Sequence, residues 1–189
     1  YVLVIVITLI ISVSGTIFGL RYFGYLDSKK IENKVTNISL NESDTIKSAI
    51  DKVYNSSVYI ETYINSRVSG SGSGFVYKID DKFGYILTNF HVIDGASKVE
   101  VTNVNGETVS AKILGGDEYT DLAVLRIDKS SVLLSAELKE SDSSNIGDTV
   151  FTVGSPMGKT YMGTVTKGII SGKNRSVTVG LTSGGNYVM

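Results

Sequence analysis

The hydrophobic positions of the 189-residue chain begin with one long apolar segment. Residues 1–20 carry no charged side chain, and most of them are aliphatic. Twenty helical residues span ~30 Å, which is the thickness of the hydrocarbon core of a bilayer. Arg21, Tyr22 and Tyr25 follow, and cationic and aromatic side chains are typical of the membrane interface. The pattern therefore predicts a transmembrane anchor over residues 1–21.

A cleaved signal peptide is the alternative for this segment. The apolar region of a signal peptide is usually shorter, and no clear small-x-small cleavage site precedes a charged stretch here, so we favour a retained anchor. Residues 22–44 are polar without a sustained apolar period, which predicts a stalk or linker. The chain starts at Tyr1 and stops directly after a strand-like segment, so we expect both natural ends to be missing.

After the polar segment, an apolar stripe predicts a short helix. Ile46, Ala49, Ile50 and Val53 recur at helical spacing, and Asp44 is expected to cap the helix. Beyond this helix, short apolar segments are separated by Gly, Asn and Asp, as in antiparallel sheet proteins. The predicted strands cover residues 57–64, 74–79, 84–88, 98–102, 108–115, 122–127, 149–153, 163–171 and 176–181, with a strand-like segment at 186–189. Such a series predicts an all-β barrel or sandwich and not a doubly wound sheet.

The composition excludes several kinds of site. The chain has no cysteine and one histidine, so it can form neither a disulfide framework nor the usual zinc site. A net charge of −1 gives no electrostatic case for nucleic acid or anionic lipid as the main partner. The segment 70–74 lacks the Gly-Lys-Ser/Thr ending of a phosphate loop, and we expect a flexible turn that enters a strand. Gly115 and Gly116 are also expected to form a turn.

The candidate chemistry centres on His91 and Asp121. His91 follows the predicted strand that ends at Thr88, and a strand followed by a turn is a rigid mount for a base. Asp121 precedes an apolar strand, where a buried carboxylate needs a partner such as an imidazole N–H. That bond would fix the tautomer and leave the other ring nitrogen free as a base. Each residue taken alone could be structural, and composition does not choose among the nearby acids. These other acids are Asp94, Asp117, Glu118 and Asp128.

A series of motifs extends this interpretation. In order they are Gly72-Ser-Gly-Phe-Val-Tyr, Gly84-Tyr-Ile-Leu-Thr-Asn-Phe-His-Val-Ile, Thr120-Asp-Leu-Ala-Val-Leu-Arg-Ile, Ile146-Gly-Asp, Val153-Gly-Ser-Pro-Met-Gly and Gly163-Thr-Val-Thr-Lys-Gly-Ile-Ile-Ser-Gly-Lys-Asn-Arg. Their order and gaps, over residues 46–189, resemble those of HtrA/DegP serine proteases. Histidine before aspartate is also the order of the chymotrypsin-type triad.

The resemblance implies a trypsin-like double six-stranded antiparallel β-barrel over residues 45–189. The first barrel, with its leading helix, would occupy residues 45–135 and be complete, and residues 136–189 would form part of the second. His91 would act as general base and then general acid, and Asp121 would orient it.

The resemblance also implies a nucleophilic serine in a Gly-Asn-Ser-Gly-Gly-Pro-like loop, which we expect beyond Met189. Ser183 precedes two glycines but is rejected, because Thr182 stands where the family has Asn and Asn186 where it has Pro. Ser183 also comes too early in the chain. We therefore expect no nucleophile within these residues and no proteolytic activity from them alone.

For the whole protein, the resemblance implies degradation of misfolded polypeptides without a cofactor or metal. It implies a single-pass protein of a bacterial cytoplasmic membrane, anchored in the bilayer through residues 1–21, with an extracytoplasmic protease domain. A homo-oligomer such as a trimer and a downstream PDZ domain are further implications, and nucleic acid is not an expected partner. The alternative is a catalytically inactive, membrane-tethered peptide-binding or chaperone module of the same fold.

Overall fold

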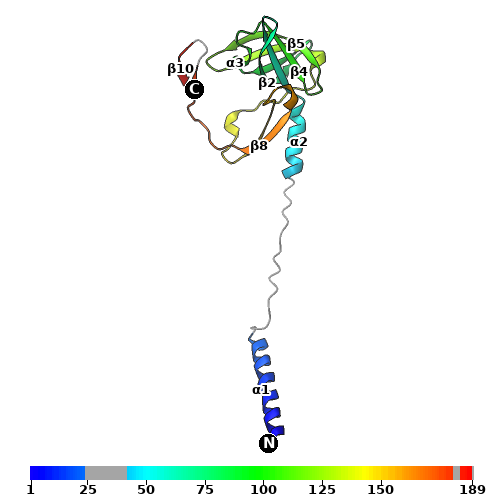
Figure 1. Ribbon diagram of the computed structural model, residues 1–189, viewed down its shortest axis with the longest axis vertical. Coiled ribbons are helices and arrows are strands. Elements are labelled where there is room, and N and C mark those ends of the chain that lie inside the picture. The colour runs from blue at the N-terminus through cyan, green and yellow to red at the C-terminus, as the bar shows by residue number, and fades with distance from the viewer. Residues whose placement is uncertain (24–41, 181–183, 189) are drawn as a thin grey trace. The chain divides into compact units, whose positions relative to one another are not determined.

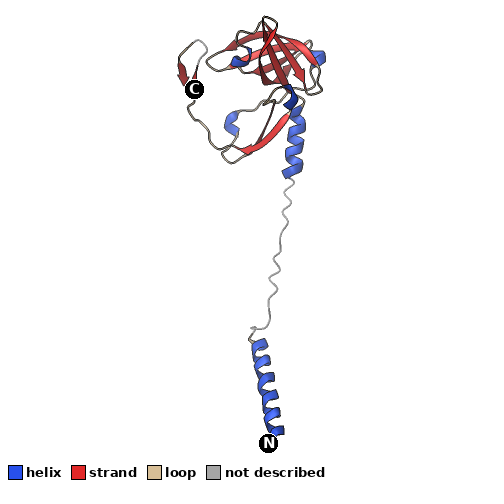
Figure 2. Cartoon of the chain, in the orientation of Figure 1, coloured by secondary structure: helices blue, strands red, loops and turns tan. Residues whose placement is uncertain are grey.

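The computed structural model describes residues 1–23, 42–180 and 184–188. The chain divides into two compact units, residues 1–40 and 41–189. Most of the predicted stalk lies outside the described residues. The elements of each unit are drawn in Figure 1, and their secondary structure is coloured in Figure 2.

Helix α1, Val2–Tyr22, accounts for the described part of the first unit. It buries no side chain within the chain, and it is long and apolar enough to cross a membrane. The hydroxyl of Thr8 donates to the carbonyl of Val4, and that of Thr16 to the carbonyl of Ser12. These polar groups are therefore satisfied inside the helix, as an apolar solvent requires. The helix is compatible with an anchor or with a signal sequence.

The second unit begins with helix α2, Glu42–Tyr54. The helix already begins two residues before Asp44, so the expected cap at Asp44 is wrong. Directly after the helix, the backbone N–H of Ser56 and its hydroxyl both donate to the carbonyl of Val53. This capped end turns the chain into the first strand.

A closed antiparallel barrel with strand order β1-β2-β3-β6-β5-β4 forms the centre of the unit. Its interior is apolar: Ile60, Ile86 and Leu125 have no exposed surface, and Val99 and Val101 retain 1%. The strands are β1 Ser57–Ile64, β2 Arg67–Ile79, β3 Phe83–Thr88, β4 Lys98–Asn103, β5 Thr108–Asp117 and β6 Leu122–Asp128. The predicted all-β class and the complete six-stranded first barrel are confirmed.

Both glycine-rich segments that were expected to form turns lie within strands, so these two predictions are wrong. Gly72 pairs with Ile60 and Gly74 with Val58, which continues β2 through the segment. A Cβ at Gly74 would stand 2.9 Å from the Ile60 side chain, so the glycine permits a close approach to β1. Gly115 and Gly116 pair with β6 after an irregularity in β5, and a local turn signal is overridden by this pairing.

Beyond the barrel, the described strands pair in twos. Strand β7, Thr149–Gly154, pairs with β8, Thr164–Ile169, and β9, Thr178–Gly180, pairs with β10, Asn186–Val188. Strand β8 is shorter than predicted, and β9 begins two residues later than predicted; residue 181, where it was predicted to end, lies outside the described residues. Three single turns of 3-10 helix lie between strands: η1 Lys129–Ser131, η2 Ser141–Ser143 and η3 Lys159–Tyr161.

Candidate active site

His91 lies on a four-residue helix, α3, Phe90–Ile93, that follows β3 directly. The sequence predicted a turn at this place. Phe90 and Val92, on either side of the histidine, pack against the barrel core. The imidazole points the other way, and 67% of the side chain is exposed. The short helix therefore presents the ring to solvent while its neighbours hold the backbone against the barrel.

Asp121 ends the tight turn between β5 and β6. The carboxylate of Asp117 accepts hydrogen bonds from the backbone N–H groups of Tyr119 and Thr120 and from the Thr120 hydroxyl, at 3.2, 3.3 and 2.8 Å. These bonds fix the turn and lower the pKa of Asp117. Asp121 then adopts a φ of 52°, in the left-handed region that few residues other than glycine enter. An outlier of this kind is common where a functional side chain must be aimed.

The structure brings His91 and Asp121 into direct contact. One carboxylate oxygen, Oδ2, lies 2.8 Å from the imidazole Nδ1, and the other, Oδ1, accepts the backbone N–H of His91 at 2.9 Å. The Asp121 side chain is 23% exposed, so the acid is only partly buried where the sequence predicted a buried one, because the turn lies at the rim of the barrel. The contact itself was predicted. Among the other acids that composition left as candidates, Asp117 accepts hydrogen bonds within the turn that precedes Asp121.

Asn89 is a third member of this arrangement that the sequence analysis did not identify. Its amide donates to Oδ2 of Asp121 and to the backbone carbonyl of Asp121, both at 3.1 Å. The Phe90 N–H donates to the same carbonyl at 3.0 Å. The only signal in the sequence was one polar residue between an apolar strand and the histidine. Residues 89–91 therefore hold both the side chain and the backbone of Asp121.

The electrostatics of the pair determine which ring nitrogen carries the proton. Partial burial raises the pKa of Asp121, but hydrogen bonds from the His91 backbone, the imidazole and Asn89 outweigh it, and the net pKa lies below the ordinary value. The carboxylate is consequently ionised at neutral pH and can only accept hydrogen bonds. In the neutral imidazole, Nδ1 must then hold the proton, and Nε2 keeps a free lone pair. This is the tautomer that a general base requires.

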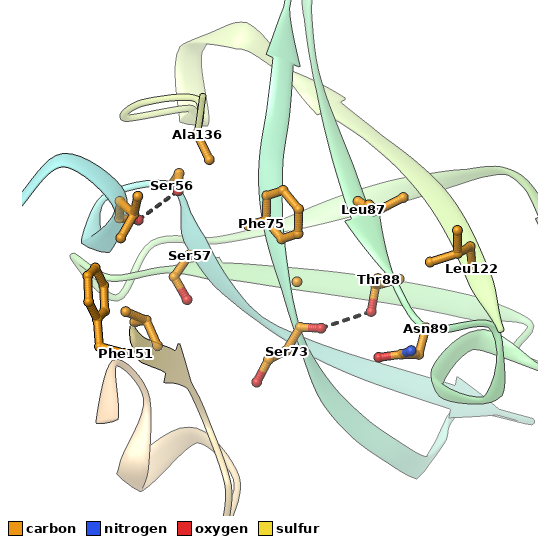
Figure 3. A pocket seen from close by; sticks show the side chains of 13 residues that line it. Ser56, Ser57, Ser73, Phe75, Leu87, Thr88, Asn89, Leu122, Ala136 and Phe151 are labelled. Atoms are coloured by element: carbon orange, nitrogen blue, oxygen red, sulfur yellow. Dashed lines mark hydrogen bonds between the residues drawn. The ribbon is translucent and has the colours of Figure 1, made fainter. Parts of the chain in front are cut away.

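A pocket of about 450 Å³ lies next to this arrangement and shares Asn89 with it (Figure 3). Its lining is mostly apolar, with Phe75, Leu87 and Leu122 from the barrel and Phe151 from β7. Two other residues of the lining are joined by a hydrogen bond: the Thr88 hydroxyl donates to the backbone carbonyl of Ser73 at 2.9 Å. A concave, mostly apolar surface thus begins at Asn89, the residue whose amide holds Asp121.

Two further points from the sequence concern the nucleophile and a metal site. Ser183, which the sequence analysis rejected as nucleophile, lies outside the described residues. Within residues 1–23, 42–180 and 184–188, no group of three or more His, Asp or Glu side chains could hold a metal ion.

Comparison with known proteins shows which protein family this chain resembles. Residues 72–189 match the family model of the trypsin-like peptidase domain. The chain is 40% identical to the serine protease Do-like HtrA of Lactobacillus helveticus in an alignment 174 residues long, which covers 89% of this chain and 41% of that protein. It is 47% identical to the serine protease Do-like HtrB of Bacillus subtilis over 112 residues, 59% of this chain and 24% of that protein. The chain thus spans less than half the length of these relatives.

The fold has a counterpart among solved structures as well. The crystal structure of the serine endoprotease from Yersinia pestis is similar with a TM-score of 0.61 and 31% sequence identity. The similarity covers 75% of this chain and 52% of that chain. The sequence matches and the fold match therefore point to the same protein family.

Proposed function

The chain belongs to the HtrA family of trypsin-like serine proteases, and on this premise we propose that it supplies the acid–base pair of a serine endopeptidase. His91 is the general base and Asp121 the residue that orients it. The observation that supports this most directly is the 2.8 Å contact between Oδ2 of Asp121 and Nδ1 of His91. The proposed nucleophile is a serine beyond Met189, in a longer protein that contains this chain.

The reaction follows from the free lone pair on Nε2. The serine oxygen attacks the carbonyl carbon of the scissile peptide bond, and its proton passes to Nε2 of His91. The imidazolium that forms is stabilised by the Asp121 carboxylate, and it then gives the proton to the leaving amine, so that an acyl-enzyme remains. Water attacks the acyl carbon in the second half, with His91 again accepting and returning one proton.

The domain division that we propose places a protease domain over residues 45–189. Residues 45–135 are the first barrel with its leading helix, and residues 136–189 are part of a second barrel. The closed barrel and the paired strands β7 and β8 support this division. Residues 22–44 would be a linker between the protease domain and the apolar helix.

For the cellular role, we propose a single-pass protein of a bacterial cytoplasmic membrane that degrades misfolded polypeptides outside the cytoplasm. Helix α1 would be the anchor in the bilayer, which its apolar composition supports. Family membership supports polypeptide substrates and a homo-oligomer such as a trimer. The chain's near-neutral net charge gives no reason to propose nucleic acid as a partner.

The test uses the longer protein, purified with and without the substitution His91→Ala, and measures the cleavage of unfolded casein. We expect cleavage by the wild-type protein and loss of cleavage in the variant. The matched control is Asp94→Ala, which removes an exposed acid near the same short helix and should leave the rate unchanged. Full cleavage by His91→Ala would exclude the assignment of the base. Binding of casein without cleavage by the wild-type protein would favour the inactive peptide-binding module.

A further inference from the structure

We propose that Gly72 and Gly116 are positioning residues for His91, because the absence of a side chain at each lets one neighbour of the histidine lie against the barrel. The proposal rests on the role of His91 given above. Neither glycine has a left-handed backbone, so the need for glycine comes from space and not from dihedral angles.

Gly72 in β2 lies beneath Val92, the residue that follows His91. A Cβ at position 72 would stand 2.6 Å from Cγ2 of Val92 and 2.8 Å from Cγ1, with the Val92 Cβ at 3.3 Å. Both methyl groups are too close, and a change of χ1 rotamer moves only one of them away, so one short contact remains. Valine is also restricted at χ1 within a helix. The backbone of α3 would have to move away from β2.

Gly116 in β5 lies beneath Phe90, the residue that precedes His91. A Cβ at position 116 would stand 2.7 Å from Cδ2 of the Phe90 ring, and the Ala123 Cβ and the Leu122 carbonyl lie at 3.2 Å. The new methyl group would therefore be crowded by the Phe90 ring and by barrel atoms at the same time. The barrel is pinned by the pairing of β5 with β6, so the phenylalanine has to give way.

These two contacts bear directly on the His91–Asp121 pair. The N–H of Phe90 donates to the backbone carbonyl of Asp121, and the N–H of His91 donates to its carboxylate. A shift of α3 at either end would lengthen these bonds together with the bond to Nδ1. The residues on both sides of His91 can thus pack against the barrel only because positions 72 and 116 carry no side chain, and this packing sets the position of the imidazole.

Gly115 provides a matched control within the same strand. It immediately precedes Gly116, its backbone is not left-handed, and a Cβ there would meet no atom of the described residues within 4 Å. Substitution by alanine at position 115 changes composition and strand propensity in the same way as at position 116. The two substitutions differ in what the new methyl group touches.

The experiment exploits the single histidine of the chain. Long-range proton–nitrogen NMR spectra of the isotope-labelled 189-residue chain in detergent micelles report the tautomer of His91 at a pH where the imidazole is neutral. In the wild-type chain and in Gly115→Ala we expect one tautomer, with the proton on Nδ1 and slow to exchange. In Gly72→Ala and Gly116→Ala we expect loss of that slow proton and appearance of the other tautomer. The double variant Gly72→Ala/Val92→Ala removes both clashing methyl groups and should restore the wild-type spectrum.

The backbone amide spectrum of the barrel strands is recorded for each variant. The proposal requires that the barrel signals persist while the His91 tautomer changes. An unchanged tautomer in both glycine variants would overturn it, as would loss of the barrel signals or failure of Val92→Ala to restore the tautomer. None of these outcomes depends on proteolysis. If the NMR test contradicts the role of the glycines, the proposed protease function is unaffected. If the casein test fails, the NMR result can still be interpreted.

Discussion

Asn89 donates one amide group to two different oxygens of Asp121, its carboxylate Oδ2 and its backbone carbonyl, each at 3.1 Å. Asn89 precedes α3, which carries His91, and Asp121 ends the turn that enters β6. The amide thus fixes Asp121 relative to His91, the proposed base, before any substrate is present. Such a preformed arrangement avoids reorganisation during the reaction.

The first prediction concerns the substitution Asn89→Ala. It removes a donor that lowers the pKa of Asp121, so that pKa should rise towards the ordinary value of 3.8. The bond from the His91 N–H remains, so the pair should loosen but not separate. We expect kcat of the longer protease to fall about tenfold, which corresponds to ~1.4 kcal/mol of barrier. Steady-state peptide hydrolysis at neutral pH measures the change, and an unaltered kcat would show that the amide has no role.

The second prediction concerns stability in acid. The Asp80 carboxylate accepts hydrogen bonds from the Tyr85 hydroxyl at 2.6 Å and from the N–H groups of Lys82 and Phe83 at 2.8 and 2.7 Å. These bonds lower the pKa of Asp80 from 3.8 to about 2. Since the folded value lies below the unfolded one, the stabilisation is fully present above pH 3.8 and is lost as the pH falls towards 2.

Asp80→Asn should therefore have a lower urea midpoint than the wild-type chain at pH 7, and the two midpoints should converge near pH 2. Urea titrations followed by circular dichroism at several pH values measure this difference. A difference that stays constant from neutral pH to pH 2 would mean that the Asp80 charge does not contribute.

The third prediction tests the barrel core. Leu125 in β6 has no exposed surface, and Leu125→Ala leaves a cavity that the neighbouring strands cannot fill. We expect the free energy of unfolding to decrease by about 2–5 kcal/mol. Leu138 is 60% exposed, and the control Leu138→Ala should change stability by less than about 0.5 kcal/mol. Equal effects of the two substitutions in chemical denaturation would contradict the assignment of the core.

The fourth prediction concerns the apolar helix α1. An aspartate near its centre, Ile10→Asp, should raise the free energy of membrane insertion by about 3–4 kcal/mol, because an unfavourable residue replaces a favourable one. After expression in bacteria and alkaline extraction, the wild-type protein should remain with the membranes, and the variant should be released in part. The intact mass of the wild-type protein distinguishes an anchor from a signal peptide, because removal of residues 1–21 would show that the segment is cleaved.

The strands of the first barrel were predictable because its core has to come from short apolar segments, and Gly, Asn and Asp separate these segments along the chain. The bounds of β1 agree with the prediction at both ends, and its core residues Val58 and Ile60 are buried as the pattern requires. The pairing of His91 with Asp121 was inferred from the chemistry of an acid beside an apolar strand and from the family resemblance. Neither inference needed a detailed backbone path.

The features that the sequence did not predict depend on contacts between distant segments. The helix α3 is too short to show a helical period, and it is fixed by Phe90 and Val92 against the barrel. The segment 70–74 has the composition of a turn, but its pairing with β1 keeps it extended. The left-handed backbone of Asp121 and the double hydrogen bond from Asn89 follow from tertiary geometry that no local pattern encodes.

The central claim is that the Asp121 carboxylate sets the tautomer of His91 so that the imidazole can activate a serine. The rate of labelling of the longer protein by a fluorophosphonate, which modifies activated serines, measures this activation directly. We expect labelling of the wild-type protein and about 10⁴-fold slower labelling of Asp121→Asn, because an asparagine amide favours the wrong tautomer. The 189-residue chain, which lacks the proposed nucleophile, should not be labelled. Equal labelling rates for the wild-type protein and Asp121→Asn, or rapid labelling of the 189-residue chain, would contradict the account.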